Sequence, residues 1–146
     1  QSLGAGNPEH AAQRGWTTIL IGVSSLTLCA LPVVLFAGWI MQAFTEVPQI
    51  VQIGIIYLWA MALAEPFMCL SIIAGGALRG AGDTRPALYY TLIAQWLIRL
   101  PVGYALAFHL GWDINGLWAA LVVFSALQGW LTMWKFKKGE WREREI

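Results

Sequence analysis

Three long stretches of this chain contain neither a charged residue nor a histidine, and they constrain the fold more than any other feature. They cover residues 15–45, 47–64 and 114–134. A helix needs about 20 mostly apolar residues to cross the hydrocarbon core of a bilayer, and the core helix of a soluble protein has no need of such a length. The mean hydropathy of +0.61 and the 12% share of charged residues agree with this reading. The chain is therefore predicted to lie in a membrane.

Four membrane-spanning helices are predicted from these stretches and the breaks between them, which gives an all-α membrane protein. The predicted spans are residues 16–44, 49–78, 87–110 and 114–136. Glycines after the second span suit a helix end, and Gly111 with Asp113 suits the turn before the fourth span. Residues 137–146 mix acidic and basic side chains and are predicted to be a solvated tail.

Basic residues near the span ends predict the orientation of the chain. They occur before the first span, in the loop after the second span and in the tail, and neither of the other two loops has a Lys or Arg. Cytoplasmic loops carry an excess of Lys and Arg. We therefore expect a multi-pass protein of the inner (plasma) membrane, with both ends of this chain in the cytoplasm and the lipid bilayer as its surroundings.

Two ionisable side chains, Glu65 and Arg99, fall within predicted spans. A charge at the centre of a span costs about 2.5–3.5 kcal/mol on insertion scales, so its presence usually has a reason. Glu65 lies thirteen residues before Leu78, and Arg99 lies thirteen residues after Pro86 on the same side, roughly 20 Å in each case at ~1.5 Å per residue. We hypothesise that the two interact, directly or through water. Glu65 is either a proton or cation site, a structural ion pair, or a carboxyl kept neutral by its apolar surroundings, and Arg99 has a pairing and positioning role. Gln95 lies one turn before Arg99 on a polar and small stripe.

Prolines occur inside three of the predicted spans, at Pro32, Pro66 and Pro101. A proline inside a helix removes one backbone hydrogen bond and tends to kink the helix. Kinked or broken helices often line the cavities of transporters, although membrane helices also tolerate proline for structural reasons. Three such prolines favour a transporter.

Several other functions find no support in the sequence. His10 and His109 are far apart, and no serine has a base at helical spacing, so neither a metal site nor an enzyme is predicted. The net charge of +1 gives no electrostatic basis for binding nucleic acid. Cys29 and Cys69 lie in apolar runs and are read as small hydrophobic residues.

The loop after the second span resembles a motif of the MATE (multidrug and toxic compound extrusion) family. Residues 76–86 read GALRGAGDTRP, which is similar to the family's ALRGxGDTR segment. Further similarities are QSLGAGNPE at residues 1–9, WLIRLP at 96–101 and GLW at 116–118. The loop residues that carry the resemblance are Leu78, Arg79, Gly80, Gly82, Asp83, Thr84 and Arg85.

This resemblance implies a fold and a function. MATE proteins have twelve transmembrane helices in two lobes, and the chain resembles their helices 9–12, so residues 1–146 would be part of the C-terminal lobe. The family exports cationic or amphipathic compounds in exchange for sodium ions or protons, with no other cofactor, and the remaining helices would be partners of this chain. Many members carry an acidic residue at the position of Met68, and Glu65 lies one turn away on roughly the same face.

Two other readings remain open at this stage. Lipid-linked saccharide flippases share the overall helical plan. A self-contained four-span structural or assembly protein would use Glu65 and Arg99 only to hold its helices together.

Overall fold

The computed structural model describes residues 7–82, 88, 89 and 91–139, and the elements assigned in them are helices. The two segments labelled η are π-helical. The elements are α1 (Pro8–Leu35), α2 (Ala37–Phe44), α3 (Pro48–Gly80), η1 (Ile93–Arg99), α5 (Leu100–Tyr104), η2 (Ala105–His109) and α6 (Asp113–Lys138).

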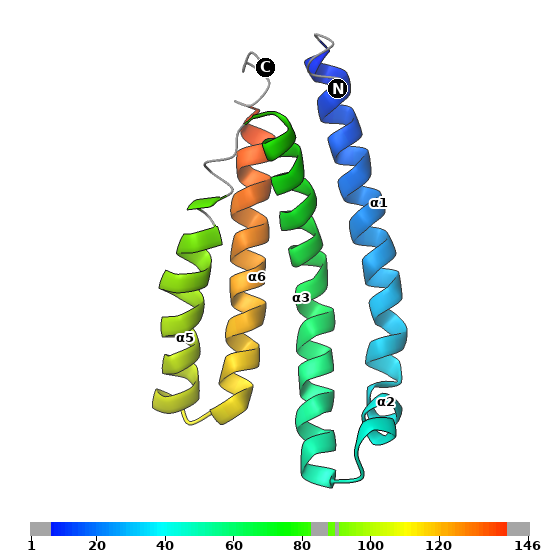
Figure 1. The fold of residues 1–146 in the computed structure, drawn as a ribbon, viewed down its shortest axis with the longest axis vertical. Helices are drawn as coiled ribbons and strands as arrows, with labels where there is room; N and C mark the ends of the chain where they lie inside the picture. Colours follow the sequence, from blue (N-terminus) through cyan, green and yellow to red (C-terminus); the bar gives the residue numbers. More distant parts are fainter. Residues whose placement is uncertain (1–6, 83–87, 90, 140–146) are drawn as a thin grey trace.

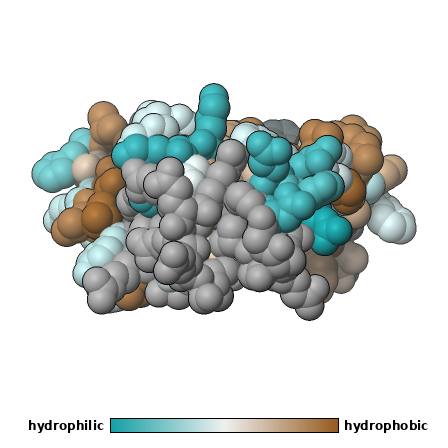
Figure 2. All heavy atoms as spheres, turned by 90° about the horizontal axis from the view of Figure 1, so that it is seen from above, coloured by the Kyte–Doolittle hydropathy of each residue, from teal (hydrophilic) through white to brown (hydrophobic). Residues whose placement is uncertain are grey.

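The long helices stand side by side in one layer (Figure 1). Helix α3 packs between α1 and α6, and the segment from η1 to η2 packs on α6. Pro8, Gly80 and Lys138 all lie at one end of the layer, and α2 lies at the other. Seen from the first end, the outline is wider than it is deep, and hydrophobic residues lie toward both of its narrow sides (Figure 2).

Three of these helices are long and apolar enough to cross a membrane: Glu9–Leu35, Pro48–Gly80 and Asp113–Lys138. They correspond to the first, second and fourth predicted spans, with somewhat different ends. Helix α1 begins well before the predicted residue 16, and α6 includes the first two residues of the predicted tail. The predicted third span, residues 87–110, is divided among η1, α5 and η2, and residues 87 and 90 lie outside the described part.

The first predicted span is interrupted at Phe36, between α1 and α2. Pro32 lies one turn earlier and has no N–H, so the helical hydrogen bonding before the break is already incomplete. The Phe36 N–H donates to the Pro32 carbonyl at 2.9 Å, and the Trp59 indole N–H from α3 donates to the Val34 carbonyl at 3.2 Å. The predicted first span, residues 16–44, thus contains two helices, and the break between them lies one turn after the predicted kink residue Pro32.

The other two internal prolines differ in their local structure. Helix α3 continues through Pro66 without interruption. Pro101 lies at the start of the short α5, between the two π-helical segments. Its ring cannot fit against the carbonyl four residues earlier, and the wider π-helical turn is a way to relieve such a conflict. The Leu110 N–H accordingly donates to the Ala105 carbonyl, five residues earlier, at 3.2 Å.

Small residues bring α3 and α6 close together. The buried residues of this pair of helices include Ala64, Ala74 and Gly75 on α3 and Ala120 and Gly129 on α6. A Cβ atom built on Gly129 would lie 2.7 Å from the Phe67 carbonyl oxygen, so only glycine allows this approach. Membrane helices typically associate through small residues, because lipid supplies no hydrophobic driving force between them.

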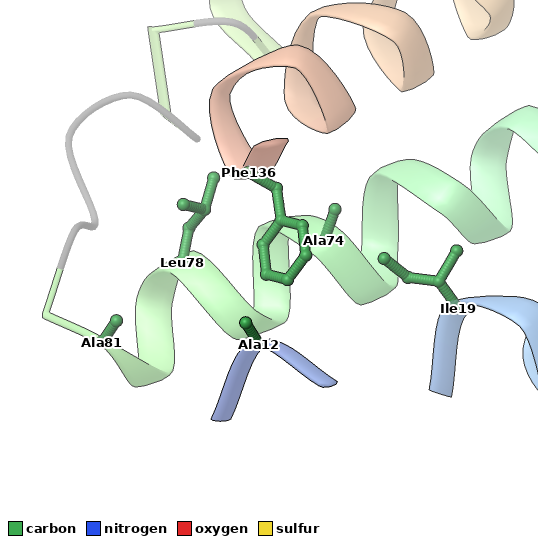
Figure 3. Close-up of a cluster of buried hydrophobic side chains, with 6 residues drawn as sticks. All are labelled: Ala12, Ile19, Ala74, Leu78, Ala81 and Phe136. Carbon is green, nitrogen blue, oxygen red and sulfur yellow. The ribbon is translucent and has the colours of Figure 1, made fainter. Parts of the chain in front are cut away.

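A cluster of buried hydrophobic residues joins α1, α3 and α6 near their common end (Figure 3). Phe136 is 1% exposed, and its ring lies between Leu78 and Ala74 of α3. The same ring meets Trp16 of α1 edge-on, with 5.9 Å between the ring centroids. Phe136 therefore ties the last turn of α6 to both neighbouring helices.

Candidate functional site

Glu65 lies partly buried near the middle of α3 and lines a hollow of about 230 Å³ between α3 and α1. Leu26, Cys29, Ala30 and Val33 of α1 form one side of this hollow. On the α3 side its neighbours are Leu58, Met61 and Ala62. Among the described residues that line it, Glu65 is the only charged one. The other residues that line the hollow are apolar, so water competes weakly for a cation bound near Glu65.

Arg99 lines a second, larger hollow of about 540 Å³ between α3, α6 and the last turn of η1. Met61 and Met68 of α3 form part of its wall, together with Met41 of α2. Tyr57 of α3 and Trp118 of α6 supply aromatic surface. The hollow thus combines one guanidinium group with soft, polarisable and aromatic walls.

The guanidinium of Arg99 is held by contact with an aromatic ring of α6. Its central carbon lies 5.5 Å from the centroid of Phe124. This distance is within the range of a cation–π interaction, which is worth about 2 kcal/mol when the pair is shielded from water. Arg99 ends the π-helical segment η1, one residue before α5 begins. The irregular backbone before Pro101 thereby sets the position of this side chain.

Glu65 and Arg99 form no direct ion pair within the described part of the chain, and their hypothesised interaction through water stays a prediction. The two residues line neighbouring hollows, and Met61 borders both. Equal depth in two adjacent spans does not make a pair, because α6 packs between α3 and the η1 segment. Phe124 of α6, not Glu65, is the partner that the structure gives to Arg99.

The structure also places Met68, the position of the family's acidic residue, and Gln95, the residue one turn before Arg99. Met68 lies on the wall of the Arg99 hollow and is not among the residues that line the Glu65 hollow. Gln95 is partly buried on η1 and is not among the residues that line either hollow. The ion-coupling role of Glu65 and the cavity roles of Gln95 and Met68 stay predictions.

The family-like loop is described only in its first part. Leu78 is fully buried in the cluster with Phe136, whereas Arg79 and Gly80 are exposed at the end of α3. Gly82 has a φ of +76°, a left-handed conformation that favours glycine and ends the helix. The remaining motif residues lie outside the described part, namely Asp83, Thr84 and Arg85.

Two functional candidates were missed by the sequence reasoning, Tyr57 and Trp118. Their rings contact each other across α3 and α6, with 4.7 Å between the centroids. The Trp118 indole nitrogen is buried and has no hydrogen-bond partner in the described structure. Composition could not single them out, because most aromatic residues in such a chain face lipid equally well. The GLW match at residues 116–118 was the one available signal.

Comparison with known families finds one match over most of the chain. Residues 1–105 match the family described as MatE. A "Probable multidrug resistance protein NorM" from Mesorhizobium japonicum is 36% identical over 140 residues, which cover 90% of this chain and 30% of that protein. A protein of the same description from Thermotoga maritima is 27% identical over 146 residues, covering 98% of this chain and 31% of its own length.

A solved structure has the same fold. It is described as "MATE transporter ClbM in complex with Rb+", and it superposes with a TM-score of 0.89 at 23% sequence identity. The match covers 98% of this chain and 34% of that protein. The chain thus spans about a third of the length of these relatives.

Proposed function

The chain belongs to the MatE family, and on that premise we propose that it is part of a secondary active antiporter. Relatives that are described as multidrug resistance proteins support drug export as the function. The transported molecules are cationic or amphipathic compounds, and sodium ions or protons drive their export in exchange. The two alternatives, a saccharide flippase and a self-contained assembly protein, are not favoured by these relatives.

In this proposal the chain is part of the C-terminal lobe of a twelve-helix, two-lobe transporter. The relatives' greater length leaves room for the other helices. In this arrangement the residues from η1 to η2 complete a fourth span, which the helix packed on α6 in Figure 1 supports. The shared end of α1, α3 and α6 carries Arg14, Arg79 and Lys137 and faces the cytoplasm of the inner membrane.

The observation that carries the proposal is the position of Glu65, an ionisable residue partly buried among apolar residues of α1 and α3. An ionisable residue inside a membrane protein is a functional candidate by default. A sodium ion or a proton on Glu65 would neutralise the carboxylate and reduce the cost of its burial. Release of that ion on the other side of the membrane restores the charge. The two states of Glu65 can therefore favour two arrangements of the helices around it.

The experiment compares Glu65→Gln with Glu46→Gln in the full-length transporter that contains this chain. Glu46 lies in the turn between α2 and α3 and outside the Glu65 hollow. Purified protein in liposomes is tested for ethidium transport under an imposed sodium gradient or proton gradient alone. Loss of a charged hydrogen-bonding partner costs about 1.5–3 kcal/mol. We therefore expect the ion-driven rate to fall about tenfold or more in Glu65→Gln and to stay unchanged in Glu46→Gln.

Three outcomes distinguish the possibilities. A rate that falls under one gradient only identifies the coupling ion. An unchanged rate in Glu65→Gln would assign Glu65 to helix packing. Absence of ethidium transport by the unaltered protein under both gradients would reject the proposed antiport.

A further inference from the structure

We propose that the Arg99 hollow binds aromatic anions, so that the amphipathic molecules exported by the proposed transporter include aromatic carboxylates. This inference rests on the proposed function and adds a class of ligand to it. The charge of the hollow is the first reason. Arg99 is the only charged residue among the described residues that line it, and Glu65, which borders the adjoining hollow, is not among them. A cation in this hollow would meet a like charge, whereas a carboxylate would meet its complement.

The walls of the hollow suit an aromatic ring. Tyr57 and Trp118 make a tilted pair with 4.7 Å between their centroids, and Tyr57 is 36% exposed. Met61 and Met68 lie on the same wall. Thioether sulfurs make favourable contacts with aromatic rings and adapt to ligands of different shape. A ligand ring can therefore lie against Tyr57 and the two methionines.

The guanidinium is positioned for such a ligand. Its contact with Phe124 fixes one side of the group, and no carboxylate of the described chain forms an ion pair with it. An arginine whose face rests on an aromatic ring keeps its N–H edge for a planar carboxylate, which it can bind with two hydrogen bonds. The size of the hollow, about 540 Å³, falls within the range of small-molecule sites.

The test uses three probes that share one ring system and differ in charge. They are 2-naphthoate, 2-naphthylmethylammonium and the neutral 2-naphthylmethanol. Binding is measured by equilibrium dialysis with the full-length transporter in nanodiscs, and empty nanodiscs correct for partition into lipid. We expect 2-naphthoate to bind at least about tenfold more tightly than the ammonium probe, because its carboxylate can form a hydrogen-bonded charge pair with Arg99.

Four variants show whether Arg99 makes the difference. Arg99→Gln should weaken 2-naphthoate about tenfold and leave 2-naphthylmethanol within twofold, and Arg99→Lys should retain part of the preference. Met68→Glu keeps Arg99 but adds a carboxylate to the wall, so the preference should shift toward the ammonium probe. The control, Arg79→Gln, removes an exposed arginine at the end of α3 and should change nothing.

Three results would overturn the inference. The first is tighter binding of the ammonium probe by the unaltered protein. The second is an equal loss of all three probes in Arg99→Gln, which a purely structural arginine would produce. The third is no saturable binding above empty nanodiscs, as expected if other helices of the transporter fill the hollow. Ethidium transport by the same purified protein in liposomes reports on the proposed antiport separately, so the failure of either idea can be recognised.

Discussion

Gly129→Ala offers the sharpest test of how α3 and α6 pack. The added Cβ would lie 2.7 Å from the Phe67 carbonyl oxygen and 3.3 Å from two other backbone atoms of Phe67. Ordinary contact begins at 3.4 Å, so the helices must separate locally by about 0.7 Å, the difference between 3.4 and 2.7 Å. Backbone atoms cannot rotate away as a side chain can. The strain therefore falls on the interface itself.

Two matched substitutions isolate this strain from the general effect of replacing glycine in a helix. A Cβ on Gly76 of α3 would meet no atom within 4 Å. The three atoms nearest to a Cβ on Gly54 of the same helix all belong to the side chain of Met41, which is flexible. All three substitutions gain about 0.8–1.0 kcal/mol of helix propensity, and only Gly129→Ala pays an overpacking cost of about 1–3 kcal/mol. The free energy of unfolding should therefore be about 1–3 kcal/mol lower for Gly129→Ala than for Gly76→Ala.

Thermal unfolding of the full-length transporter in detergent measures the difference. We expect the melting temperature of Gly76→Ala to be highest, Gly54→Ala to follow closely and Gly129→Ala to lie several degrees below both. Equal melting temperatures for all three variants would refute the reasoning, because they would mean that α3 and α6 do not approach as closely at Gly129 as the structure places them.

Two further predictions concern single side chains. Phe136→Ala empties a fully buried site, so it should lower the free energy of unfolding by about 3 kcal/mol. The control Phe108→Ala, at a position 73% exposed, should change the melting temperature little. Similar losses of stability in the two variants would contradict the assignment of Phe136 to the core. Trp59→Phe removes the hydrogen bond to the Val34 carbonyl, which is worth about 0.6 kcal/mol in a membrane protein. It should therefore speed amide hydrogen exchange near Phe36. The control Trp39→Phe, at a position 79% exposed, should leave that exchange unchanged. Unchanged exchange in Trp59→Phe would mean that the bond does not stabilise the break.

The positions of the long helices could be predicted because one physical requirement determines them. A span must exclude charge over about 20 residues, and the uncharged runs of this sequence leave few choices for α3 and α6. The turn at Gly111 was also readable, since a φ of +66° there favours glycine. The break at Phe36 could not be predicted from the sequence. Pro32 and Pro66 look alike in the sequence, yet only the helix with Pro32 is interrupted nearby. The difference depends on tertiary partners such as Trp59, which no local pattern records.

The candidate site shows the same limit. Similar depths of Glu65 and Arg99 in their spans could be predicted from the sequence, because helix rise converts residue number into distance. It could not give the direction that each side chain faces, which depends on how α3, α6 and the π-helical segment are rotated against one another. The two π-helical segments shift that rotation, since a π-helical turn places the following residues differently from an α-helical one. Arg99 is the last residue of the first of these segments, so its partner could not be read from spacing.

The separation of Glu65 from Arg99 strengthens the case that both have functions. A buried ion pair can be explained as structure alone, because each charge compensates the other. Here each charge lines its own hollow, and Met61 stands between the two. An uncompensated charge in a membrane costs free energy, which selection tolerates where the charge binds something. The Glu65 hollow has the sign to hold a cation, and the Arg99 hollow has the sign and the aromatic walls to hold an organic anion. A ligand in one hollow would then affect the affinity of the other through the shared wall at Met61, and such coupling between sites is what an exchanger requires.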